Sequence, residues 1–286
     1  MKFGLIPVNV GTKSAEQVVG LAQLAEAAGM ESVWTFEHVM VPRNYNSKYP
    51  YHKSGKMGIE PEANFIDPLI ALTTVAAHTK TLRLGTGVNI LPQCNPLLLA
   101  KQAASLDLMS NGRFMLGVGI GWLREEYEAM GVPFERRGAR YDDYLRAMKK
   151  VWSGAEVEHE SEFLHWHGFH SFPIPAQKPH LPIIIGGASG KVFERVALYG
   201  DGWYAPVDNA DDLVPPLQKL KAACNVHERD YNSIELTAMF NPGDGLDGVQ
   251  RYQDLGVQRL TVPLHSLGED PIKGISELGE QVIAKL

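Results

Sequence analysis

This chain is poor in cysteine, has no long apolar run and carries no excess of basic residues. Its two cysteines, Cys94 and Cys224, lie far apart in no metal-ligand spacing, which favours reduced thiols in a cytoplasmic protein. No apolar run approaches the roughly 18 residues of a membrane span. The net charge of −6 argues against nucleic acid as a partner, because phosphate binding requires a basic surface. These absences predict a soluble cytoplasmic protein with neither a membrane nor a nucleic-acid partner.

What the chain does contain is a regular alternation of β-rich and helical segments. The segment Met1–Val10 has no small-residue cleavage site, so it is interpreted as a first strand and not as a signal peptide. The eight strand candidates are Phe3–Val8, Ser32–Phe36, Leu82–Ile90, Phe114–Val118, Pro182–Ile185, Gly202–Pro206, Ile234–Phe240 and Arg259–Pro263. Eight such units predict a single (β/α)8 TIM barrel domain over residues 1–286. An open doubly wound sheet is the competing fold, although neither half has a G-x-G-x-x-G fingerprint after a first strand.

Capping signals mark the helices between these strands. Ser14 and Gln17 have the spacing of a capping box. A capping residue precedes a proline at the first helical position in Asp67-Pro68, Asn95-Pro96 and Asp270-Pro271. Gly29, Gly200 and Gly256 each end a helix shortly before the next strand. The caps therefore agree with the alternation of strands and helices.

Glycines gather at the carboxyl ends of two strand candidates. Gly117 and Gly119 end the apolar run that begins at Phe114, and Gly85 and Gly87 lie in the third strand candidate. Bare backbone at such positions lets a flat or charged ligand approach closely. In the third strand the glycines also predict a β-bulge or an unusual peptide bond. The alternative is a tight turn that only requires small residues.

The fifth strand candidate runs into a second glycine-rich segment, Gly186-Gly187-Ala188-Ser189. A helix is expected to follow from about Lys191 to Tyr199, with Ser189 as its capping residue. Free backbone N–H groups and the helix dipole make such a start an anion site. The segment therefore predicts a phosphate-binding turn, and the alternative is a plain turn without a ligand.

Two ionisable residues, Glu37 and His38, end the second strand candidate. In a barrel this position is typical of catalytic residues, while the alternative is a structural histidine. Cys94 has no visible base beside it and is not favoured as a nucleophile. Glu125 and Glu126 open the next helix and are assigned no catalytic role.

Two stretches interrupt the alternation. About 27 residues from Val39 to Phe65 form a loop insertion (about 39–66), which in a barrel would lie over the mouth; the alternative is a solvated, mobile loop. Within it, Tyr45, Tyr49 and Tyr51 could line a pocket, and Arg43, Lys48, Lys53 and Lys56 could receive an anion. The second stretch, about 156–181, is interpreted as an inserted hairpin around Gly168. Its histidines 159, 165, 167 and 170 lack a carboxylate or cysteine at ligand spacing, so no metal site is predicted.

Several of these motifs together resemble the luciferase-like monooxygenase superfamily. They are Glu37-His38, Leu84-Gly85-Thr86-Gly87-Val88, Ala100-Lys101-Gln102, Gly112-Arg113-Phe114, Leu116-Gly117-Val118-Gly119, Gly121-Trp122, Arg136-Arg137-Gly138, Ile185-Gly186-Gly187 and Gly200-Asp201-Gly202-Trp203. The pattern is most similar to the branch of oxidoreductases that use the deazaflavin coenzyme F420. The resemblance implies a bacterial luciferase-like (β/α)8 barrel, a homodimer, and a non-proline cis peptide at Gly87–Val88 beneath the cofactor ring.

The resemblance also implies the functional residues. The cofactor contacts would come from Thr86, Gly87, Val88, Asn89, Gly117, Gly119, Gly186, Gly187, Ala188 and Ser189. His38 would bind substrate or deliver a proton, with Glu37 as its electrostatic neighbour. Some relatives carry a catalytic glutamate just after strand four, where this chain has Ile120.

Hydride transfer between coenzyme F420 and a small organic substrate is therefore the expected activity. One alternative is an FMN-dependent monooxygenase that receives reduced flavin from a partner reductase and reacts with oxygen. A second alternative, kept open by Ile120, is a cofactor-binding protein without turnover.

Overall fold

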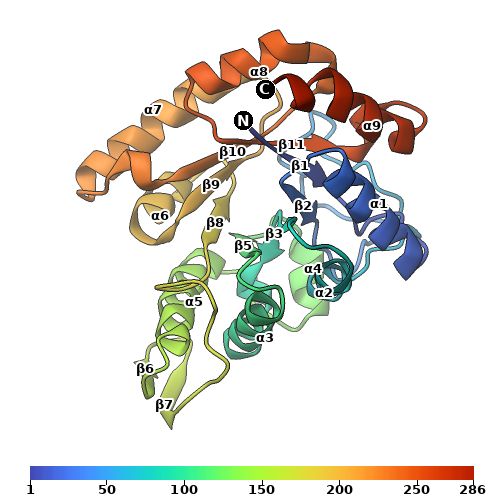
Figure 1. Ribbon diagram of the computed structural model, residues 1–286. Coiled ribbons are helices and arrows are strands. Elements are labelled where there is room, and N and C mark those ends of the chain that lie inside the picture. Colours follow the sequence, from blue (N-terminus) through green and yellow to red (C-terminus); the bar gives the residue numbers. More distant parts are fainter.

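The computed structural model describes all 286 residues and contains a closed barrel of parallel strands surrounded by helices (Figure 1). The barrel strands are β1 (Lys2–Ile6), β2 (Ser32–Thr35), β3 (Arg83–Thr86) with β4 (Asn89–Ile90), β5 (Phe114–Gly119), β8 (Ile183–Gly186), β9 (Gly202–Ala205), β10 (Glu235–Met239) and β11 (Arg259–Pro263). The first and last strands pair, and β3 pairs with β5, so the sheet closes on itself. The predicted (β/α)8 barrel is confirmed, and the open sheet is excluded.

Nine helices connect the strands or follow the last one. They are α1 (Ala15–Ala27), α2 (Pro68–His78), α3 (Pro96–Met109), α4 (Arg124–Ala129), α5 (Arg137–Trp152), α6 (Val192–Tyr199), α7 (Ala210–Val226), α8 (Gly245–Asp254) and α9 (Pro271–Gln281). The side chains of Ser14, Asp67, Asn95 and Asp270 accept hydrogen bonds from the first turns of their helices, as predicted. No helix has the length and apolar character needed to cross a membrane.

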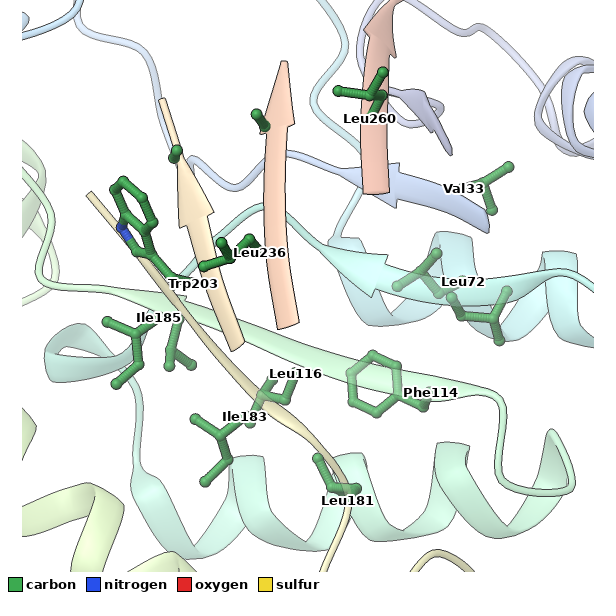
Figure 2. Packing of buried hydrophobic residues seen from close by; sticks show 14 of the residues in the cluster. Val33, Leu72, Phe114, Leu116, Leu181, Ile183, Ile185, Trp203, Leu236 and Leu260 are labelled. Carbon is green, nitrogen blue, oxygen red and sulfur yellow. The ribbon is translucent and has the colours of Figure 1, made fainter. Parts of the chain in front are cut away.

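Most of the apolar core lies between the strands and the helices. Alternate residues of a strand point to opposite faces, so Phe114 and Leu116 of β5 point outward, as does Ile183 of β8. Figure 2 shows these side chains on the helix-facing side of the sheet, with Val33 of β2 near Leu72 of α2. This outer layer joins 55 buried residues into one cluster, which holds the helices against the barrel.

The barrel interior has a smaller apolar layer and an ionic end. Trp34 packs against Tyr204 there with ring centroids 5.5 Å apart. At the amino-terminal end of the strands, the fully buried guanidinium of Arg259 makes two bonds of 2.9 Å to Glu31 and pairs with Glu235. Two carboxylates therefore satisfy the buried cation at this end of the barrel.

Strand three is divided by a bulge. Gly85 pairs with Met115 and Asn89 pairs with Val118, so four steps along this strand match three steps along β5. The Gly87–Val88 peptide within the bulge is cis, as the family resemblance implied. The Thr86 hydroxyl donates to the Gly117 carbonyl (2.7 Å) and accepts from the Gly117 amide (2.9 Å). One side chain thus replaces the missing strand-to-strand hydrogen bonds.

The second insertion contains the predicted hairpin, β6 (Val157–Glu160) and β7 (His165–Phe169), which projects beside α5 (Figure 1). Its turn lies at residues 161–164, so Gly168 sits inside β7 and not at the turn. The rest of the insertion returns to the barrel, where the Gln177 side chain donates to Asp107 (2.7 Å) and to the Phe114 carbonyl (2.7 Å).

We expect Gly117→Ala to lower the free energy of unfolding by about 3 kcal/mol or more, because its Cβ would collide with the Thr86 carbonyl oxygen. Backbone cannot rotate away as a flexible side chain can. Gly20→Ala is the matched control: nothing lies within 4 Å of a Cβ there, and alanine favours the α1 helix. Urea unfolding of both variants checks this, and equal stability of the two would contradict the close approach.

Candidate functional site

A cavity of about 560 Å³ opens at the carboxyl ends of the barrel strands. Of the residues predicted for the site, eight line it: Glu37, His38, Gly87, Val88, Gly119, Gly186, Gly187 and Ser189. Thr86, Asn89 and Gly117 lie outside its lining. Ala188 lines a shallower neighbouring groove between residues 50–53 and 206–207. The structure thus brings together residues from the segment after β2, the bulge, β5, and the end of β8 with the turn that follows it.

The Val88 side chain forms part of the cavity floor. A Cβ at Gly119 or at Gly186 would lie 2.7 Å from a Val88 methyl group. These glycines therefore make room for the protein's own bulge, as Gly117 does for Thr86, while Gly119 and Gly186 also line the cavity. Gly187 differs, because the nearest atom to a Cβ there is 3.7 Å away and its φ is +120°.

Glu37 is held by one side-chain donor and one main-chain donor of β4, which follows the bulge. One carboxylate oxygen accepts from the Asn89 side-chain amide (2.6 Å) and the other accepts from the Ile90 amide. Burial raises the pKa of Glu37 to about 7, and the nearby Glu126 carboxylate adds to the shift. Asn89 Oδ1 has no partner, and a half-turn of the Asn89 amide would let it accept a hydrogen bond from neutral Glu37.

His38 is positioned by Glu126 and not by Glu37. Its Nδ1 lies 2.9 Å from Glu126 Oε2, and the other Glu126 oxygen accepts from the Val39 amide (2.6 Å). Glu126 is fully buried. The His38 Nε2 has no hydrogen bond and is not enclosed by the protein, so it faces the cavity that His38 lines. Glu126 is therefore a site residue that the sequence analysis missed.

A signal for Glu126 was available in the helical spacing. Leu123 and Tyr127 are both fully buried, and they lie three residues before and one residue after Glu126. Glu126 follows Leu123 by three residues, so the two side chains lie on the same side of the helix, and this spacing predicts that the carboxylate is buried. Burial of an unpaired carboxylate is costly, so a partner close in space is required.

The neighbouring residue, Glu125, fixes the loop insertion over the mouth. Its carboxylate accepts from the amides of Asn46 (2.7 Å) and Ser47 (3.2 Å). Tyr49, Tyr51 and Lys48 then line the cavity, as predicted. The other basic and aromatic residues of this loop lie elsewhere: Tyr45 packs on Trp122, Lys56 lies over Tyr45, Arg43 pairs with Glu62, and Lys53 lines the shallower groove.

One side of the cavity is basic. Arg195 of α6 pairs with Asp142 (2.5 Å), yet its Nη1 makes no hydrogen bond, and Arg137 of α5 likewise has an unused Nη2. Both arginines line the cavity. The amides of residues 188–191 donate no hydrogen bond within the protein, and the predicted Ser189 cap is wrong because α6 begins at Val192 without a side-chain cap. These groups together can bind an anion.

Three other sequence candidates contribute no reactive group. Ile120 places an apolar side chain in the lining, and its carbonyl accepts from the Tyr127 hydroxyl (2.6 Å). Burial raises the pKa of the Cys94 thiol well above its usual range, which leaves it a poor nucleophile. In the hairpin, His159 pairs with Asp143 while His165 and His167 pair with Glu160, and no group of three or more ligands is placed to hold a metal.

We predict that Glu37→Gln removes a pH-dependent loss of stability. Between pH 4.5 and 7 the unfolded chain ionises Glu37 while the folded protein keeps it protonated, so the free energy of unfolding falls as pH rises. Glutamine does not titrate. The stability of the variant relative to the wild type should therefore rise by about 3 kcal/mol from pH 4.5 to pH 8. Urea titrations at pH 4.5, 6 and 8 measure this, and a constant difference would refute the shift.

Comparison with known proteins places these features in a family. The profile of the luciferase-like monooxygenases matches residues 1–242. An uncharacterised protein of Mycobacterium bovis is 31% identical over 280 residues, covering 94% of this chain and 95% of its own. An F420-dependent glucose-6-phosphate dehydrogenase of Gordonia bronchialis is 28% identical over 78% of this chain and 64% of its own.

The oxygenase component of a flavin-dependent trigonelline monooxygenase from Acinetobacter baylyi is 33% identical over 59% of this chain and 42% of its own. Among solved structures, the coenzyme F420-dependent tetrahydromethanopterin reductase of Methanopyrus kandleri superposes with a TM-score of 0.79. That likeness covers 99% of both chains at 16% identity and so concerns the fold. With its closed barrel, its bulged third strand and a family profile that covers most of its length, the chain belongs to the luciferase-like monooxygenase family.

Proposed function

We propose that the protein is an oxidoreductase that transfers hydride between coenzyme F420 and a small organic substrate held in the cavity at the barrel mouth. The observation that carries the proposal is the composition of this one cavity. It has a rigid floor at Val88, a basic side at Arg137 and Arg195, and a histidine with a free ring nitrogen at the end of β2. The relative from Gordonia bronchialis is F420-dependent by name, which supports the same choice of cofactor.

The basic side fits the phosphate of such a cofactor. A phosphate bears several acceptor oxygens, and the free guanidinium nitrogens of Arg137 and Arg195 are donors suited to them. The unused amides that follow Gly187 add uncharged donors. A Cβ at Gly187 would meet its neighbours only at ordinary contact distance, 3.7 Å from Val192 and 3.9 Å from the Tyr51 hydroxyl, so nothing packs tightly on this glycine.

The floor fits the flat ring system. The methyl groups of Val88 are packed against Gly119 and Gly186. Because this packing leaves Val88 little room to move, a ring would stack on a surface of fixed shape. When bound, the cofactor supplies or accepts the hydride, and the protein orients the reactants and excludes water.

The substrate side carries the group for proton transfer. His38 Nε2 faces the cavity, while Nδ1 is held by the Glu126 carboxylate. A histidine that is oriented through one nitrogen can hold or deliver a proton through the other. His38 is thus the proposed catalytic residue, and Glu126 is proposed as its positioning residue. Glu37 holds the bulge segment through Asn89 and Ile90.

An FMN-dependent monooxygenase is the second candidate, because the Acinetobacter baylyi relative is a flavin-dependent oxygenase component by name. FMN also has a flat ring and a phosphate, so the same floor and basic side suit it. In that case the protein requires a reductase partner to supply reduced flavin.

Cofactor titration tests the first choice. Apoprotein is titrated separately with F420 and with FMN, and binding is followed by the fluorescence of each cofactor. We expect saturable F420 binding that is at least tenfold tighter than FMN binding. If the protein bound FMN tightly and did not bind F420, the proposed F420-dependent function would be rejected and the FMN-dependent monooxygenase would be favoured. Failure to bind either cofactor would reject both.

A second prediction addresses the phosphate side. Gly187→Asp should abolish cofactor binding, because a carboxylate beside the free amides repels the phosphate. Gly187→Ala is the matched control, since both variants place a Cβ at the same positive φ and only one adds a charge. We expect the alanine variant to keep binding within about tenfold while both variants remain folded by circular dichroism. Equal binding losses would mean that charge at Gly187 is irrelevant to the ligand.

A further inference from the structure

Aromatic residues enclose the substrate side of the cavity around one central ring. The Trp122 indole, at the end of β5, meets the edges of three neighbouring rings: His38 (6.0 Å), Tyr45 (5.6 Å) and Tyr49 (5.2 Å between centroids). His38 in turn meets the edge of Phe65 at 5.6 Å. His38, Tyr49, Phe65 and Trp122 all line the cavity, and we call these four residues the aromatic cage.

Few polar groups in and beside the aromatic cage are free to bind a substrate. Both oxygens of the nearby Glu37 are already engaged by the bulge segment, and His38 Nδ1 is engaged by Glu126. This leaves the Trp122 indole N–H, His38 Nε2 and the Tyr49 hydroxyl, whose raised pKa, caused by burial, keeps it protonated. Lys48 also borders the cavity, but it is exposed on the loop and therefore remains solvated at the rim.

From this arrangement we propose that the substrate is a planar conjugated carbonyl compound, with its ring in the aromatic cage and its oxygen at His38 Nε2. The inference rests on the proposed function, because it presumes that the cofactor occupies the floor and the basic side. Flat rings gain both buried area and favourable edge contacts from such a cage. One carbonyl oxygen matches the small number of donors.

A phosphorylated sugar fits this side poorly. Its hydroxyl groups surround the edge of the ring and would lose their hydration, while the cage offers few polar partners to replace it. Its phosphate would need the arginines that the proposed function assigns to the cofactor. Although one relative acts on glucose 6-phosphate by name, we therefore expect this chain to discriminate against that class.

Calorimetric titration of the cofactor-loaded protein tests the inference by binding alone. The probes are 4-phenyl-3-buten-2-one, which is planar and conjugated, and glucose 6-phosphate. We expect saturable binding of the ketone and at least tenfold weaker binding of the sugar phosphate. Trp122→Leu, which keeps an apolar side chain, should weaken ketone binding about tenfold. Tyr49→Leu, on the loop side of the cage, should weaken it in the same direction and serves if Trp122→Leu does not fold.

Trp166→Leu is the matched control, because Trp166 lies on the hairpin strand β7 outside the cavity and its loss should leave ketone binding unchanged. Tighter binding of glucose 6-phosphate than of the ketone would overturn the inference, as would ketone binding that neither cage variant weakens. A protein that binds cofactor but no planar ketone would overturn the inference and leave the proposed function standing. Failure of the wild-type protein to bind F420 would count against the proposed function.

Discussion

The Thr86 carbonyl oxygen occupies the space that a side chain at Gly117 would need, and the cavity floor depends on this approach. Because the two backbones can lie so close, the chain leaves the regular ladder after Gly85 and rejoins it at Asn89. The Thr86 hydroxyl supplies the hydrogen bonds lost in between. Val88 is thereby lodged between glycines of two further strands, so the floor is made of locked backbone and methyl groups.

Above this floor, the adjacent carboxylates of Glu125 and Glu126 in α4 bind different partners. Glu125 accepts hydrogen bonds from main-chain amides of the loop insertion. Glu126 accepts a hydrogen bond from the Val39 amide at the start of the same loop, and it also orients His38. A long segment without secondary structure loses conformational entropy when it is ordered, and these bonds offset part of that cost. The loop can then contribute Tyr49 and Phe65 to the cavity at fixed positions. The order of the loop and the orientation of the histidine therefore have a common source.

The charge distribution suits two ligands in one cavity. The chain has a net charge of −6, and the exposed Asp208, which lines the cavity, has no ion-pair partner, but the other carboxylates in and beside the cavity are compensated. Burial raises the pKa of Glu37 to about 7, Glu126 is hydrogen-bonded to His38 and to the Val39 amide, and Asp142 is paired with Arg195. Free donor capacity remains on Arg137 and Arg195, while the aromatic cage has little polarity. An anionic group and an apolar ring thus meet different surfaces.

The amino-acid sequence alone determined the eight strand–helix units, the helix starts at Asp67, Asn95 and Asp270, and the irregular third strand. These features depend on residues within a turn or two of one another, so local chemistry decides them. It could not determine that His38 pairs with Glu126, which is 88 positions away, or that Glu37 turns to the bulge segment. Nor could it separate glycines whose Cβ would collide with the protein from Gly187, where a Cβ would make only ordinary contacts. Only barrel closure decides which residues become neighbours, because contacts between distant segments depend on the space that all the other strands leave.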